Sequence, residues 1–127
     1  MSTAVLIDSS VWIEILNKGV SARQCAQSLK EADRVYVPTL VLYEVYKKIT
    51  SSRSEDQALS AIAMMSQFDV MDMTREIALA AADISIQKGL AMADSVVLAH
   101  AQQVGATLLT MDNDFSEIPG VKVLRKA

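Results

Sequence analysis

The chain has 127 residues, of which 51% are hydrophobic and 21% are charged, a composition typical of a folded globular protein rather than a disordered one. Its net charge of −3 argues against a protein that holds nucleic acid by charge alone, although an enzyme could still reach phosphates through a bound cation. The single cysteine excludes an internal disulfide, and no apolar run approaches the roughly 20 residues of a membrane span, so we expect one cytoplasmic domain over residues 1–127.

Short apolar runs alternate with helical patterns along the chain. The runs expected to form strands are 4–7, 35–37, 70–71, 107–109 and 121–124. The segments expected to form helices run from a cap at Ser9 or Ser10 to Gly19, over 21–32, from a cap at Thr39 through Ile49, and over 54–68, 74–88 and 93–104. This alternation predicts a parallel sheet covered on both faces. We therefore expect a three-layer α/β/α sandwich with a short, mainly parallel central sheet.

Three acidic residues lie shortly after the ends of predicted strands. Asp8 comes after the run AVLI, and Asp112 and Asp114 come just after the run TLL. In open parallel sheets, binding sites form beyond the carboxyl ends of the strands. Asp8 and Asp112 are therefore expected to line the same crevice, although they lie far apart in the sequence.

Two further acidic residues lie in apolar helical surroundings. Glu44 lies in TLVLYEVYKKI, and Asp94 lies in GLAMADSVVLAHA. Taken singly, Glu44 reads as a surface acid and Asp94 as an acid in the first turn of its helix, where the helix dipole favours negative charge. Beside the acids at the strand ends, both also become candidates for a shared carboxylate cluster.

A cluster of carboxylates needs a counter-charge. Three pairs about 6 Å apart, at an effective dielectric constant near 20, would cost roughly 8 kcal/mol before relaxation. A divalent cation removes this repulsion, and ligands that are all oxygen suit Mg²⁺ or Mn²⁺. Such an ion polarises a phosphoryl oxygen and lowers the pKa of an attacking water, so the pattern favours chemistry at phosphate.

In order along the chain, four stretches resemble those of the PIN-domain nucleases, in particular the VapC-type toxins of toxin–antitoxin pairs. The matching stretches are VLIDSSVWIEIL, VPTLVLYEV, AMADSVVLAHAQQVGATLLTMDNDF and PGVKVL. The resemblance covers nearly the whole chain and implies a single PIN-like nuclease domain. Each stretch alone is common, whereas the ordered set is fairly specific.

The resemblance also implies a function and a set of site residues. It implies a metal-dependent endoribonuclease that cleaves RNA with a metal-activated water, uses Mg²⁺ or Mn²⁺, forms a homodimer and is neutralised by a cognate antitoxin. The acids at the catalytic and metal-binding positions are Asp8, Glu44, Asp94 and Asp112. The supporting positions are Ser9, Ser10, Thr110 and Asp114, the last acting through a water.

Two other functions remain as alternatives. A phosphoacceptor domain of the receiver type is also a small α/β protein with acids and Mg²⁺, but it needs an acidic pair where Asp8 is followed by Ser9. A PIN domain that only binds RNA or an antitoxin would keep the fold without catalysis. Trp12 is expected in the core, and His100 is expected to be structural or on the surface, because it points away from Asp94 on the same helix.

Overall fold

The computed structural model describes residues 3–124 and contains a five-stranded sheet in which all strand pairs are parallel. Its spatial order is β3-β2-β1-β4-β5. The strands are β1 (Ala4–Ile7), β2 (Arg34–Pro38), β3 (Asp69–Met71), β4 (Thr107–Thr110) and β5 (Val121–Val123). The helices are α1 (Ser9–Leu16), α2 (Ala22–Glu31), α3 (Thr39–Ser52), α4 (Glu55–Met65), α5 (Arg75–Lys88), α6 (Met92–Val104) and the short 3-10 helix η1 (Asn113–Phe115).

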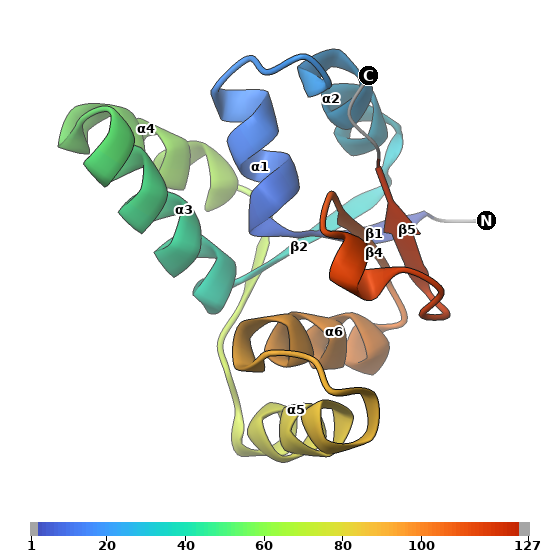
Figure 1. The fold of residues 1–127 in the computed structure, drawn as a ribbon. Coiled ribbons are helices and arrows are strands. Elements are labelled where there is room, and N and C mark those ends of the chain that lie inside the picture. The colour runs from blue at the N-terminus through green and yellow to red at the C-terminus, as the bar shows by residue number, and fades with distance from the viewer. Residues whose placement is uncertain (1–2, 125–127) are drawn as a thin grey trace.

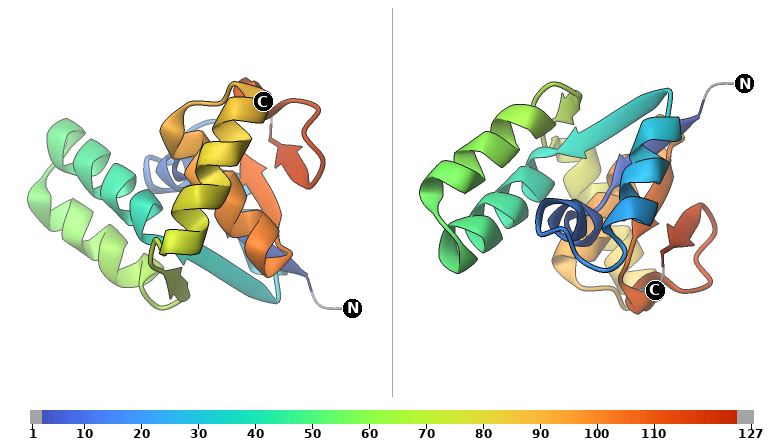
Figure 2. Two further views of the ribbon diagram at one scale, coloured as in Figure 1. Left: turned by 90° about the horizontal axis from the view of Figure 1, so that it is seen from below. Right: turned by 90° about the horizontal axis from the view of Figure 1, so that it is seen from above.

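The helices cover both faces of the sheet, as Figure 1 shows. Helices α1 and α2 lie on one face, α6 lies on the other, and α5 lies beyond α6. The α3–α4 pair extends past one edge, which is clear in both views of Figure 2. The expected α/β/α arrangement is confirmed, and the sheet is wholly parallel.

The central strand β1 carries the core and fixes the position of the site. Its residues Leu6 and Ile7 are fully buried, as both faces of the sheet are covered. The register pairs Ile7 with Leu109 of β4. The chain segments that follow β1 and β4 therefore leave the sheet side by side, and this brings Asp8 close to residues 110–114.

Some predicted helix ends were wrong by a few residues. The N-cap of α1 is Asp8 rather than Ser9 or Ser10, because the Asp8 carboxylate accepts a hydrogen bond from the Ser9 backbone N–H. The cap of α3 is Pro38, and Thr39 is its first residue. The first helix ends at Leu16 instead of continuing to Gly19.

Gly19 has a packing role in the turn after α1. The Glu14 carboxylate folds over it and accepts a hydrogen bond of 2.9 Å from the Ser21 backbone N–H. A Cβ atom at Gly19 would lie 2.2 Å from Glu14 Oε1, so a larger residue would displace the carboxylate.

Two residues weighed as functional candidates are buried. Trp12 is fully buried, as predicted, and its ring lies 5.9 Å from that of Phe68. His100 is also buried, and neither ring nitrogen has a hydrogen-bond partner within residues 3–124. Over the same residues, no helix combines the length and apolar character needed to cross a membrane.

Candidate functional site

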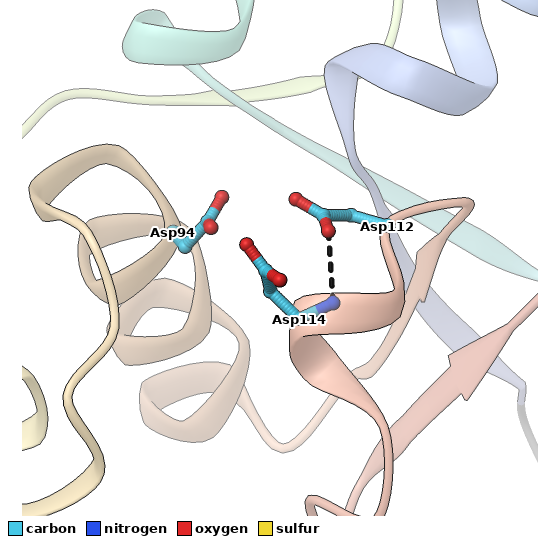
Figure 3. A group of neighbouring side chains, drawn as sticks. All are labelled: Asp94, Asp112 and Asp114. Carbon is cyan, nitrogen blue, oxygen red and sulfur yellow. Dashed lines mark hydrogen bonds between the residues drawn. The ribbon is translucent and has the colours of Figure 1, made fainter.

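Three aspartates form the centre of the candidate site. Asp94, Asp112 and Asp114 each offer a carboxylate oxygen, and these oxygens lie within 4.8 Å of one another. Figure 3 shows Asp94 on α6 facing the other two across a small gap. Three carboxylates at this spacing form an arrangement that can hold a metal ion.

The local backbone explains how these carboxylates meet. Asp94 lies in the first turn of α6, where the helix dipole favours a negative side chain. Asp112 is the N-cap of η1, and its Oδ1 accepts a hydrogen bond of 2.9 Å from the Asp114 backbone N–H. That short helix turns the chain after β4 so that Asp112 and Asp114 both face α6 (Figure 3).

Asp8 lies beside this group and is held by hydrogen bonds. It is only 7% exposed. Its carboxylate accepts bonds from the Thr110 hydroxyl at 2.7 Å, the Ser9 backbone N–H at 2.8 Å and the Ser10 hydroxyl at 3.1 Å. Burial raises the pKa of Asp8, these three hydrogen bonds oppose the rise, and the charge of Asp112 adds to it.

The hydroxyls of Ser10 and Thr110 connect the segments that follow β1 and β4. Ser10 Oγ accepts a hydrogen bond of 3.0 Å from the Met111 backbone N–H. Thr110 Oγ1 accepts one of 3.0 Å from the Asp112 backbone N–H while donating to Asp8. A single threonine hydroxyl thus fixes the relative positions of two site acids.

Glu44 approaches the site from α3. It is half-buried, and burial is the main cause of its raised pKa. The charges of Asp8 and Asp94 raise this pKa further, and a hydrogen bond from the Ser9 side chain opposes them. The interaction with both acids places Glu44 at the edge of the same negative region.

The crowding of charge is greatest at Asp94. Burial, and then the charges of Asp112, Asp8 and Asp114, raise its pKa to about 6. Two unit charges about 5 Å apart repel by about 3 kcal/mol at an effective dielectric constant of 20, before screening by salt. The charged form of Asp94 is therefore disfavoured by its surroundings, and a bound cation would stabilise it.

The structure brings all the sequence-predicted acids into one region, but not as equals. Asp94 and Asp112 lie in the group of three, whereas Asp8 and Glu44 lie beside it. Asp114, expected to assist only through a water, belongs to the group itself. The short spacing Asp-Asn-Asp after a strand was the signal for this, since a tight turn there places both carboxylates on one side.

The donor set fits a hard divalent cation. The group offers only carboxylate oxygens, the ligands that Mg²⁺ and Mn²⁺ prefer. Across residues 3–124 the one ion pair joins Arg34 to Asp69, so no lysine or arginine of that part neutralises the site acids. Uncompensated and partly buried carboxylates favour a bound cation as the missing counter-charge.

Comparison with known proteins gives a family and a set of folds. The family model described as the PIN domain matches residues 5–121. A chain of a toxin–antitoxin complex from Klebsiella pneumoniae shares 25% identity and a TM-score of 0.79, with 94% of this chain and 96% of that chain covered. No curated protein matches significantly.

Two further solved structures share the fold at lower identity. A Mycobacterium tuberculosis VapC toxin, described as cleaving the sarcin–ricin loop, shares 18% identity at a TM-score of 0.76, covering 91% of this chain and 95% of that chain. A chain of the VapBC2 complex from Rickettsia felis, solved with a fragment of promoter DNA, shares 20% identity at a TM-score of 0.74, covering 98% and 100%.

Proposed function

This chain belongs to the PIN domain family, and from that membership and the geometry of its acidic site we propose that it is a metal-dependent endoribonuclease. The observation that carries the proposal is the meeting of three aspartate oxygens within 4.8 Å, with no cationic side chain of residues 3–124 paired to them. Carboxylates arranged in this way hold the ions that enzymes use at phosphodiesters.

The proposed roles follow from the positions of the side chains. Asp94, Asp112 and Asp114 hold a divalent cation, Mg²⁺ or Mn²⁺, and Asp8 and Glu44 add negative charge beside it. When bound, the cation would polarise the phosphate and lower the pKa of an attacking water. The Thr110 hydroxyl keeps Asp8 and the Asp112 backbone in place, so that the cluster is arranged before substrate arrives.

The exposed side of α3 suits a contact with RNA. Tyr43 comes directly before the site residue Glu44 in α3 and is 59% exposed. The Lys47 ammonium lies 5.7 Å from the centre of the Tyr43 ring. An aromatic ring and a cation beside an acidic centre can stack on a base and contact a phosphate of single-stranded RNA.

We further propose that the protein is the toxin of a toxin–antitoxin pair. Support comes from the fold that it shares, at 25% identity, with a chain of a toxin–antitoxin complex. The cognate antitoxin is then its regulating partner. Growth arrest on expression, relieved by co-expression of an adjacent small gene, tests this part of the proposal.

A cleavage assay tests the nuclease assignment. Asp94→Asn and Asp112→Asn are compared with Asp56→Asn, an exposed aspartate in the first turn of α4 that serves as the matched control. With Mg²⁺ or Mn²⁺ and single-stranded RNA, we expect both site variants to lose at least about 100-fold in rate, since the lost ion supplies several kcal/mol. The control should keep its rate, and excess chelator should stop the wild type.

The outcomes are distinct. Full cleavage by both site variants, or in chelator, would refute the metal mechanism. Binding of RNA without cleavage under every metal condition would leave a PIN domain that only binds. Cleavage of DNA and RNA of the same sequence at equal rates would overturn the choice of RNA as substrate.

A further inference from the structure

The start of helix α6 has no capping side chain of its own. Its N-cap residue is Ala91, whose methyl side chain forms no hydrogen bond with the backbone N–H groups of the first turn. The first turn of an uncapped helix opens easily, because its N–H groups have no partner within the helix. Asp94 lies in this turn, so the position of its carboxylate depends on what else holds the start of α6.

Two serine hydroxyls hold the turn that precedes α6. Ser85, near the end of α5, donates a hydrogen bond of 2.8 Å to the Leu90 carbonyl oxygen, and Ser95 in α6 donates one of 3.3 Å to the same oxygen. Leu90 thus connects the two helices through a single carbonyl group. Ser95 is 1% exposed and Leu90 is 8% exposed, so water has little access to compete for these bonds.

The backbone groups of the same two serines close the turn from both ends. The Ser85 carbonyl accepts a hydrogen bond of 2.9 Å from the Gly89 backbone N–H, and the Ser95 backbone N–H donates one of 2.9 Å to the Ala91 carbonyl. Gly89 has a φ of 70°, a left-handed conformation that glycine adopts without strain. Serine side chains and backbone together therefore fix residues 89–91 between the two helices.

This restraint matters because the neighbours of Asp94 repel it. Its carboxylate faces those of Asp112 and Asp114 (Figure 3), and like charges at this spacing push one another apart. A loose first turn of α6 would allow Asp94 to move away from the other two. Helix α5 packs more extensively against α6 than against any other element, so the bond from Ser85 ties the start of α6 to a firm support.

We propose that Ser85 and Ser95 are positioning residues for the metal site. Their hydroxyls hold the Leu90 carbonyl and fix the start of α6, so that the Asp94 carboxylate stays within reach of a cation shared with the other two aspartates. The inference rests on the proposed metal site, and it assigns neither serine a contact with the ion or the substrate. Its signature is weaker binding of the cation when the two hydroxyls are removed.

The test is the dissociation constant of Mn²⁺, measured on the full chain by isothermal titration calorimetry. We expect the double variant Ser85→Ala/Ser95→Ala to bind Mn²⁺ at least about tenfold more weakly, as is usual for residues that orient a metal ligand. Each single variant should weaken binding only about threefold, because the other serine still holds the carbonyl. Ser85→Thr retains a hydroxyl at a partly exposed position and should bind Mn²⁺ within about twofold of the wild type.

The matched control is Ser54→Ala, which removes another serine hydroxyl that holds the start of a helix. Ser54 caps α4 by accepting a hydrogen bond of 3.1 Å from the Gln57 backbone N–H. This variant should lose stability as N-cap substitutions do, yet bind Mn²⁺ within about twofold of the wild type. Amide hydrogen exchange of the metal-free protein gives an independent readout. In the double variant, the backbone N–H of residue 95 should exchange at least about tenfold faster, while that of Ala101, later in α6, is unchanged.

The possible failures are distinguishable. A wild type that binds no Mn²⁺ would refute the metal site and this inference together. Binding that is equally tight in the wild type and the double variant would overturn the inference alone and leave the proposed function in place. Equal weakening by Ser54→Ala would also overturn it, because the loss would then follow from overall stability. If the double variant does not fold, Ser85→Ala and Ser85→Thr decide, since equal affinities in these two would contradict a role for the Ser85 hydroxyl.

Discussion

The acidic site and the outward side of helix α5, where Leu79 and Ile86 lie, are unusual surfaces for opposite reasons. The site gathers negative charge in partly buried positions, and the outward side of α5 exposes apolar side chains. At the site, carboxylates lie close together, and burial and the neighbouring negative charges raise the pKa of Asp94 to about 6. On the outward side of α5, aliphatic side chains are exposed to solvent, and Ile86 is 82% exposed. Within residues 3–124, no lysine or arginine forms an ion pair with the site acids, and the side chains of Leu79 and Ile86 are largely exposed. The negative charge of the site matches the cation proposed to bind there, whereas the outward side of α5 presents apolar side chains to solvent.

The two regions also differ in how firmly they are held. Asp8 has three hydrogen bonds to its carboxylate, and Thr110 joins it to Asp112. The aliphatic side chains of Leu79 and Ile86 on α5 form no hydrogen bonds, because apolar contacts are not directional. The positions of the site carboxylates are therefore fixed by hydrogen bonds, whereas the exposed aliphatic side chains of α5 have no comparable restraint.

The largest expected effect separates the regions by their response to metal. With Mg²⁺ or Mn²⁺ at about 100 times its dissociation constant, the wild type should gain about 2.7 kcal/mol and melt about 10 °C higher. Asp94→Asn should lose most of this gain, while Leu79→Glu should keep it. Thermal unfolding with and without the ion measures the difference. An equal gain in Asp94→Asn would remove Asp94 from the proposed metal site.

The next effect tests how the site is held. Thr110→Val removes the hydroxyl that donates to Asp8 and accepts from the Asp112 backbone N–H. Two buried polar groups lose a partner, so we expect unfolding free energy to fall by about 2 kcal/mol. Thr107→Val changes an exposed threonine at the other end of β4 and should stay within about 0.5 kcal/mol. Urea unfolding of the metal-free protein decides. Equal losses in the two variants would contradict a special role for Thr110.

A smaller effect concerns pH in the absence of metal. The folded pKa of Asp94 is about 6, above the ordinary aspartate value of 3.8, so the folded state binds more protons between these values. This contribution to stability is present at low pH and is lost as the pH rises through 6. We expect a loss of about 1 kcal/mol, less than the roughly 3 kcal/mol of the full shift because Asp94 is partly solvated. In chelator, Asp94→Asn should show a flatter pH profile of unfolding, and an unchanged profile would contradict this origin.

The smallest expected effect is the change in unfolding free energy on truncating Ile86, on the outward side of α5. At concentrations where the chain is monomeric, Ile86→Ala should change the unfolding free energy by less than about 0.5 kcal/mol, because the side chain has little to pack against. Ile84→Ala, on the buried side of the same helix, should cost about 2 kcal/mol or more. A large loss in Ile86→Ala would mean that the outward side already contributes to the fold of a single chain.

Much of the fold could be predicted from local patterns. The run Ala4–Ile7 is a strand as expected, and the Thr74 side chain caps α5 by accepting a bond from the Ile77 backbone N–H. The proximity of Asp8 and Asp112 could be predicted because parallel strands end at the same edge. The helix caps at Asp8 and Pro38 were missed, because nearby serines and Thr39 offer equally good capping side chains.

The finer geometry of the site could not be predicted in the same way. Asp114 joins the group of three because residues 113–115 form a 3-10 turn, which the Asp-Asn-Asp spacing indicates but hydrophobic periodicity does not. The orientation of Glu44 depends on how α3 packs against its neighbours, which no local pattern records. For α5, an apolar pattern on both sides indicates burial but not which side the rest of the chain covers.

The hydrogen bond from Thr110 to Asp8 spans 102 positions of the sequence, and this separation has a consequence during synthesis. Translation supplies Asp8 first and the carboxylates of Asp112 and Asp114 only much later. Until β4 pairs with β1, a growing polypeptide lacks two of the three oxygens that would hold an ion. Fragments released early by a stalled ribosome are therefore expected to lack the proposed nuclease activity, which requires a chain that extends through residues 112–114.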